Sequence, residues 1–153
     1  NVHNSDLVNK FGNFVNRTLN FKGLETIVSG KMDNEITDII VNKYYIISKY
    51  IENLEFRKAC AEIIDLVEIG NKYYDERKPW IDYKGNIEEF NNTIYTCTNI
   101  IANLSNMLEP LIPEKTEIIR KYLKLDKAKW EIITIDKDID VSNSIEILFE
   151  RIK

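Results

Sequence analysis

Apolar residues recur at intervals of three and four positions along most of the chain, which is the spacing of an amphipathic helix. Clusters of glycine, asparagine and proline interrupt this pattern and mark the turns, most clearly at 21–23, 79, 85–86 and 110–113. Each apolar stripe can be buried only against another helix. The pattern therefore predicts five helices, over about residues 5–19, 33–51, 53–78, 87–108 and 114–122.

The residues at the helix ends refine these boundaries. Asn4 or Ser5, Asp33 and Asn53 are each predicted to cap a helix start, because their side chains can accept hydrogen bonds from free backbone amides. Pro79 disfavours the helical conformation for the residue before it, so the third helix is expected to end by Lys78.

The C-terminal part has a different pattern. Residues 130–135 are predicted to be extended and 136–140 to form a polar turn, while 144–152 are apolar and of undecided conformation. We find no internal repeat, linker or second domain. The expected fold is all-α: an antiparallel helix bundle with an irregular C-terminal strap, forming one domain over residues 1–153.

Composition restricts the class of protein. The 153 residues suffice for one domain, and 44% of them are apolar, which is enough for a core. Lys and Arg number 21 against 25 Asp and Glu, and the net charge of -4 argues against a polybasic nucleic-acid binder. No apolar run approaches the roughly 18 residues of a membrane span, and no signal peptide is visible. Because the chain begins with Asn1 rather than Met, we expect it to be part of something longer.

Residues for catalysis or metal binding are scarce. The single histidine, His3, has no evident nucleophile as a partner, and the five glycines are too scattered for a phosphate loop. Cys60 and Cys97 are expected to be buried free thiols. Three acidic residues on the third helix are interpreted as a solvated face: Glu62, Asp65 and Glu68. The abundance of asparagine is interpreted as compositional drift.

Asn9, Asn13 and Arg17 are spaced four apart, so they project from one side of the first helix, away from its apolar stripe. Such a row is usually a solvated face. Arginine offers a fork of donors, however, and asparagine offers both a donor and an acceptor, so the row can also bind the polar edge of a nucleobase.

A second constellation lies where the third helix ends. Asn71 and Asp75 precede Pro79 and Trp80, so a tryptophan follows directly on a restricted backbone. Trp80 is either a core plug or an exposed stacking surface. Unpaired RNA bases are recognised by stacking on aromatic rings and by hydrogen bonds to their Watson–Crick edges. Together the two constellations suggest recognition of an unpaired base, with cytosine matched better than uracil.

At these residues the chain resembles the anticodon-binding domain of methionyl-tRNA synthetase, a class I aminoacyl-tRNA synthetase. Residues 4–19 resemble the family's D-L-x-N-x-x-G-N-x-x-x-R string, and residues 71–80 resemble its N-x-Y-x-D-x-x-x-P-W signature. Residues 109–113 and 147–152 resemble two further segments of the family, although Glu150 stands where the family commonly has proline. The resemblance covers essentially the whole chain.

The resemblance implies roles for individual residues. Trp80 would stack on the first base of the C-A-U anticodon, Asn13 and Arg17 would hydrogen-bond that base, Pro79 would hold the tryptophan, and Asp75 would support or electrostatically filter the site, with Asn71 beside it. Asn9 and Gly12 are expected to support helix packing. Candidate phosphate contacts are Lys10, Lys72, Arg77 and Lys78.

The resemblance also implies a longer parent enzyme. Its catalytic Rossmann domain, which uses ATP and Mg, would lie upstream, since neither ATP-handling signature occurs in this chain. Lys31 and Met32 match only the first two letters of one signature and are interpreted as a loop leading to a helix cap. The fragment itself is expected to be non-catalytic, cofactor-free and metal-free.

The expected partners are the anticodon loop of tRNA(Met) and the upstream domain, with no DNA and no membrane, in the cytoplasm. Two alternatives remain open at this point. One is a helical protein-interaction module that docks a partner helix, and the other is a helical domain with unrecognised catalysis, which the sequence barely supports.

Overall fold

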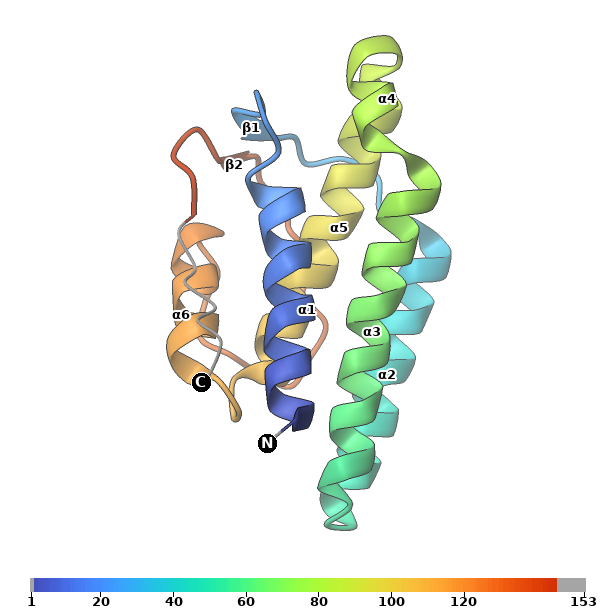
Figure 1. The fold of residues 1–153 in the computed structure, drawn as a ribbon, viewed down its shortest axis with the longest axis vertical. Coiled ribbons are helices and arrows are strands. Elements are labelled where there is room, and N and C mark those ends of the chain that lie inside the picture. The colour runs from blue at the N-terminus through green and yellow to red at the C-terminus, as the bar shows by residue number, and fades with distance from the viewer. Residues whose placement is uncertain (1, 146–153) are drawn as a thin grey trace.

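Helix α5 (Ile87–Leu108) runs through the middle of the molecule, and the other helices pack around it (Figure 1). The structure is a computed structural model that describes the backbone of residues 2–145 and the side chains of residues 6–145. The surrounding helices are α1 (Val2–Leu19), α2 (Asn34–Glu52), α3 (Phe56–Arg77), α4 (Pro79–Gly85) and α6 (Pro113–Tyr122). The all-α bundle and its five predicted helices are confirmed.

One of the three predicted helix caps is confirmed and two are wrong. Asp33 Oδ1 accepts the backbone N–H of Ile36 at 3.1 Å, so this aspartate caps α2 as predicted. Helix α1 already begins at Val2, so neither Asn4 nor Ser5 caps it. The predicted cap at Asn53 is also wrong: its backbone N–H donates to the Lys49 carbonyl at 3.1 Å, which ends α2.

A short helix not predicted from the sequence follows α3. Lys78 adopts a left-handed conformation, with φ of 51°, and ends α3 where Pro79 requires it to end. Pro79 then occupies the first position of α4, where its missing N–H leaves no hydrogen bond unmade. The chain thus changes direction through a single residue and continues helical as far as Gly85.

The C-terminal strap is held by asparagine side chains of α5 rather than by a β-sheet. Ile135 N–H donates to Asn99 Oδ1 (2.8 Å), Ile133 N–H to Asn103 Oδ1 (2.7 Å), and Asn106 Nδ2–H to the Glu131 carbonyl (3.1 Å). Asn99 and Asn103 are four helical residues apart, a rise of about 6.0 Å, while two extended residues span about 6.6–6.8 Å, so the spacing of these two asparagines matches that of Ile135 and Ile133. Residues 130–135 form neither a helix nor a β-strand, with bends at 130 and 131, so their extended conformation stays a prediction. The interpretation of asparagine as mere drift is wrong at Asn99, Asn103 and Asn106.

Two short strands join the ends of the fold. Thr26–Ile27 (β1) pairs antiparallel with Ile139–Asp140 (β2), with Ile27 opposite Ile139. The sequence did not predict this pair, and residues 139–140 were expected within a polar turn. Of the undecided segment 144–152, only Ser144 and Ile145 belong to the described residues. Among residues 2–145, no helix combines the length and apolar character needed to cross a bilayer.

Candidate nucleic-acid interface

Helices α1 and α3 lie side by side (Figure 1). They approach closely at Gly70. A Cβ atom at Gly70 would lie 2.6 Å from Cζ of Phe14, which is closer than real Cβ contacts. Only glycine therefore lets the Phe14 ring pack against α3 at this level. The close approach brings the last turn of α1 within side-chain reach of the last turns of α3.

Arg17 connects the two helices at this level. Its Nη2 donates to Asp75 Oδ1 at 2.7 Å, and its Nη1 donates to Asn71 Oδ1 at 3.4 Å. The Arg17 side chain is 33% exposed and that of Asp75 58%, so the ion pair lies at the surface. The structure thus brings together three of the predicted site residues, and the guanidinium keeps N–H donors that neither partner uses.

Trp80 is an exposed aromatic residue whose ring neighbours Tyr74. It is the second residue of α4 and is 44% exposed, whereas Pro79 before it is buried. The core-plug interpretation of Trp80 is therefore wrong. The indole ring lies 6.0 Å from the ring of Tyr74, centroid to centroid, with the planes tilted by 33°.

Asn13 belongs to a neighbouring part of the surface. It is exposed and lines a shallow pocket of about 240 Å³. The other lining residues are Asn9, Gly12, Val15 and Asn16 of α1, Asn20 directly after it, and Ile145. Residues four apart on a helix are rotated by about 40°. Arg17 is turned toward Asn71 and Asp75 of α3, whereas Asn13 lines the pocket that Ile145 also borders.

Comparison with known proteins identifies the chain. The family model described as the anticodon binding domain of methionyl tRNA ligase matches residues 25–147. The chain belongs to this family. It is 42% identical over 154 residues to methionine–tRNA ligase 1 of Bacillus cereus, and 41% identical to methionine–tRNA ligase 2 of Bacillus anthracis. Each alignment covers 98% of this chain but 28% of the relative, so the chain spans less than a third of these proteins.

Solved structures agree at the level of the fold. Apo methionyl-tRNA synthetase of Mycobacterium tuberculosis superposes with a TM-score of 0.80 and 18% sequence identity, over 99% of this chain and 33% of that one. The same enzyme in complex with methionyl-adenylate gives a TM-score of 0.72 over 80% of this chain, with 20% identity and 26% of that protein covered. The helix bundle of this chain is therefore the fold found in that synthetase.

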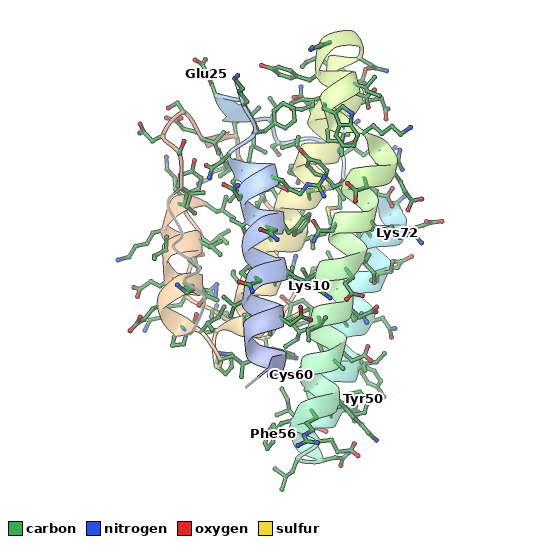
Figure 2. All side chains as sticks on the ribbon, viewed as in Figure 1. Lys10, Glu25, Tyr50, Phe56, Cys60 and Lys72 are labelled. Atoms are coloured by element: carbon green, nitrogen blue, oxygen red, sulfur yellow. The ribbon has the colours of Figure 1, made fainter. Side chains whose placement is uncertain are left out.

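Of the four candidate phosphate contacts, two are already engaged within the anticodon-binding domain. Lys10 pairs with Glu68 at 2.7 Å across the gap between α1 and α3 (Figure 2). Arg77 pairs with Asp33 at 3.0 Å. Lys72 and Lys78 are exposed, and within the described part of the chain neither forms an ion pair.

The acidic row on α3 is a set of structural ion pairs. Glu62 and Asp65 lie 2.8 and 2.6 Å from Nζ of Lys43, a lysine that is itself buried in α2. Burial alone would lower the pKa of Lys43, but the hydrogen bonds that Lys43 donates to both carboxylates raise its pKa above the ordinary lysine value. Over the described residues, no cluster of three histidine, cysteine or acidic side chains could hold a metal ion.

Tyr74 and Gly70 are the site residues that sequence reasoning missed. Both residues were assigned to the apolar face of the third helix, where their spacing matches that of the core residues. A glycine in a helix interior costs about 1 kcal/mol relative to alanine, which is the signal that could have marked a close helix contact.

Proposed function

We propose that this domain binds the anticodon loop of tRNA(Met) and recognises its first base, the cytosine of C-A-U. The observation that carries the proposal is that the exposed Trp80 and an arginine fixed by Asp75, Arg17, both lie against the ring of Tyr74. A flat aromatic surface and an oriented set of donors, side by side, are the two elements needed to bind an unpaired base.

Stacking would supply most of the affinity. The exposed side of Trp80 can accept the face of any base, and stacking of this kind contributes about 1–3 kcal/mol per base. Buried Pro79 restricts the backbone before the indole, so little conformational freedom is lost when a base binds.

Discrimination would come from Arg17 and Asn13. Cytosine presents a ring nitrogen and a carbonyl oxygen as acceptors, and an exocyclic amine as a donor. The donors that Arg17 keeps match the two acceptors, and the side-chain oxygen of Asn13 can accept from the amine. Uracil has a ring N–H and a second carbonyl in the corresponding places, so both contacts would be mismatched. We expect about 1–3 kcal/mol of discrimination, by analogy with bidentate contacts in DNA grooves.

Asn71 and Asp75 hold the arginine in this proposal. An ion pair at the surface adds only about 0–1 kcal/mol to stability, so its value lies in orientation. The carboxylate of Asp75 would also repel a phosphate that approached in a wrong register, which makes it an electrostatic filter as well as an anchor.

The parent protein would be a methionine–tRNA ligase that attaches methionine to tRNA(Met). Its catalytic domain would precede this one in the same polypeptide and would use ATP and Mg. This domain would then contribute tRNA selection alone, and the place of action would be the cytoplasm.

A titration tests the proposal directly. Stem-loops carrying C-A-U or U-A-U are added at fixed salt, since phosphate contacts make affinity salt-dependent. Binding is followed by the fluorescence anisotropy of labelled stem-loops, which serves for every variant, and also by Trp80 emission in a Trp130→Phe background wherever Trp80 is present. We expect tighter binding of C-A-U, a loss of about tenfold or more for Trp80→Ala, and a smaller gap between the two loops for Arg17→Ala and Asn13→Ala.

Matched controls separate the site from general effects. Arg57 is exposed at the opposite end of α3, Asn42 is exposed on α2, and the Lys121 side chain on α6 is 77% exposed. Alanine at each of these positions should leave both affinities unchanged. Equal small losses for site and control variants would refute the assignment of the site.

One observation favours a second surface, for protein contact. The turn between α2 and α3 exposes Ile51, Leu54 and Phe56, with Leu54 75% exposed. Figure 2 shows Tyr50 and Phe56 at this end of the bundle, whereas α4 lies at the other end. The 22 residues of α3 separate the two ends by about 33 Å. Leu54→Ser should therefore not affect RNA binding if the two surfaces act independently.

A further inference from the structure

Tyr74 is in contact with both Arg17 and Trp80. The guanidinium carbon of Arg17 lies 3.9 Å from the centroid of the Tyr74 ring, and the ring of Trp80 lies 6.0 Å from it. Tyr74 itself is only 4% exposed, so its ring forms a floor beneath the more exposed pair.

The ring restricts Arg17. A guanidinium placed over an aromatic face is attracted by the ring quadrupole, and its planar shape stacks in a defined orientation. Asp75 fixes one nitrogen of Arg17 in the plane of the guanidinium, while Tyr74 fixes that plane itself. These two restraints differ, so the ion pair alone does not replace the ring.

The hydroxyl of Tyr74 restrains the backbone as well. It donates to the carbonyl oxygen of Arg17 at 3.1 Å. Arg17 lies in the last turn of α1, which ends at Leu19, and carbonyls of a last turn have no partner within the helix. Burial raises the pKa of Tyr74, so the hydroxyl remains a donor at neutral pH.

We propose that Tyr74 is a positioning residue for base recognition: its ring and its hydroxyl together hold Arg17 in register with the stacking face of Trp80. The inference rests on the proposed function, because it concerns the same base site. Tyr74 itself is buried and would not touch the base. Its removal should therefore reduce discrimination between C-A-U and U-A-U more than it reduces stacking affinity.

Two variants separate the ring from the hydroxyl. Tyr74→Phe keeps the stacked ring and loses the hydrogen bond to Arg17, whereas Tyr74→Leu loses the ring. Tyr83→Phe is a matched control: its hydroxyl also donates to a backbone carbonyl, that of Gly23, at 3.1 Å, but away from Arg17. For each variant we measure the melting temperature and the ratio of dissociation constants for the two stem-loops.

We expect the ratio to fall about two- to fivefold for Tyr74→Phe and by more for Tyr74→Leu. Tyr83→Phe should lose a similar amount of melting temperature with no change in the ratio. Acrylamide quenching of Trp80, in the Trp130→Phe background, should increase for Tyr74→Leu, because the indole loses its neighbour.

The outcomes distinguish the two proposals. If the unaltered protein does not prefer C-A-U, the proposed function fails. If it prefers C-A-U and both Tyr74 variants keep the full ratio, only the role of Tyr74 is overturned. Should Tyr74→Leu fail to fold, Tyr74→Phe decides alone: an unchanged ratio with a lowered melting temperature would make Tyr74 merely structural.

Discussion

Arg17 and Asp75 are 58 positions apart in the chain, yet their side chains form a 2.7 Å ion pair between α1 and α3. The pair joins the two segments that carry the family resemblance, residues 4–19 and 71–80. The fold therefore brings two motifs that are distant in the sequence together on one surface. Both partners are partly exposed, which limits the contribution of the pair to stability. Its effect should therefore appear in recognition.

The first prediction concerns Asp75→Ala. We expect the free energy of unfolding to change by less than about 1 kcal/mol, because surface ion pairs contribute little. The preference for C-A-U over U-A-U should nevertheless fall, since Arg17 would no longer be held. Affinity for both loops should fall less than in Arg17→Ala, because the arginine charge is still present. Binding at fixed ionic strength measures this.

The control for that variant is Glu76→Ala, which removes an exposed neighbouring charge of the same sign. It should leave the ratio of the two affinities unchanged. If Asp75→Ala and Glu76→Ala gave the same ratio of affinities for C-A-U and U-A-U, Asp75 would act by its charge alone and would not position Arg17.

The second prediction concerns Gly70→Ala. The new Cβ would lie 2.6 Å from the Phe14 ring, so α1 and α3 must move apart. We expect a loss of about 1–3 kcal/mol in the free energy of unfolding, as for other overpacked positions, together with weaker C-A-U preference. Urea unfolding and the stem-loop titration measure the two effects.

Gly85→Ala is the matched control, because a Cβ there would meet nothing within 4 Å. It should be neutral or slightly stabilising, by up to about 1 kcal/mol, since alanine is the better helix former. If Gly70→Ala behaved in the same way, the close packing of Phe14 would not be what sets the spacing of α1 and α3.

Much of the bundle could be predicted, because helix formation depends on local spacing. Helix α5 was predicted with its observed bounds, and the Asp33 cap was predicted from one side chain. The end of α3 followed from the stereochemistry of Pro79. These features depend on residues a few positions apart, which is the range over which sequence patterns carry structural information.

The parts that were missed depend on distant contacts. Asn103 binds the strap 30 positions further along the chain, and Tyr74 binds Arg17 57 positions earlier. Neither residue has a local pattern that reveals its partner. The site residues and a supporting or filtering role for Asp75 were expected from the resemblance, whereas the ion pair of Asp75 with Arg17 and the contacts of Tyr74 required coordinates.

The third prediction concerns the strap. Asn103 binds both backbone groups of Ile133 and accepts the hydroxyl of Tyr44 at 2.8 Å. Asn103→Ala would leave these buried or half-buried groups without partners, and we expect a loss of about 2–4 kcal/mol in the free energy of unfolding. Asn42→Ala, an exposed asparagine on α2, should be neutral within about 0.5 kcal/mol.

Loosening of the strap has its own optical signature. Trp130 precedes the strap residues, donates its indole N–H to the Tyr44 carbonyl at 3.2 Å, and packs edge-on against the Tyr44 ring. In a Trp80→Phe background, Asn103→Ala should shift Trp130 emission to longer wavelength in the folded protein. An unchanged spectrum and unchanged stability would show that the asparagine contacts are not what holds the strap.

The fourth prediction is a loss of stability at alkaline pH. Burial raises the pKa of Tyr44 to about 12, against an ordinary value of 10.0. The hydroxyl donates to Asn103 and accepts from Asn106 Nδ2 at 3.1 Å, so the folded state needs it protonated. A pKa raised on folding gives stability that is full below the unfolded-state value and is lost as pH rises toward the folded-state value. The stabilisation should therefore decline between pH 10.0 and about 12.

Tyr44→Phe isolates this contribution. It should lose about 1–3 kcal/mol at pH 8, because the amides of Asn103 and Asn106 would lose a buried partner, and its stability should then fall less steeply than that of the unaltered protein above pH 10. Urea unfolding at several pH values measures both curves, with Tyr45→Phe, at a position 63% exposed, as the control. Curves that stayed parallel across the alkaline range would mean that ionisation of Tyr44 is not coupled to unfolding.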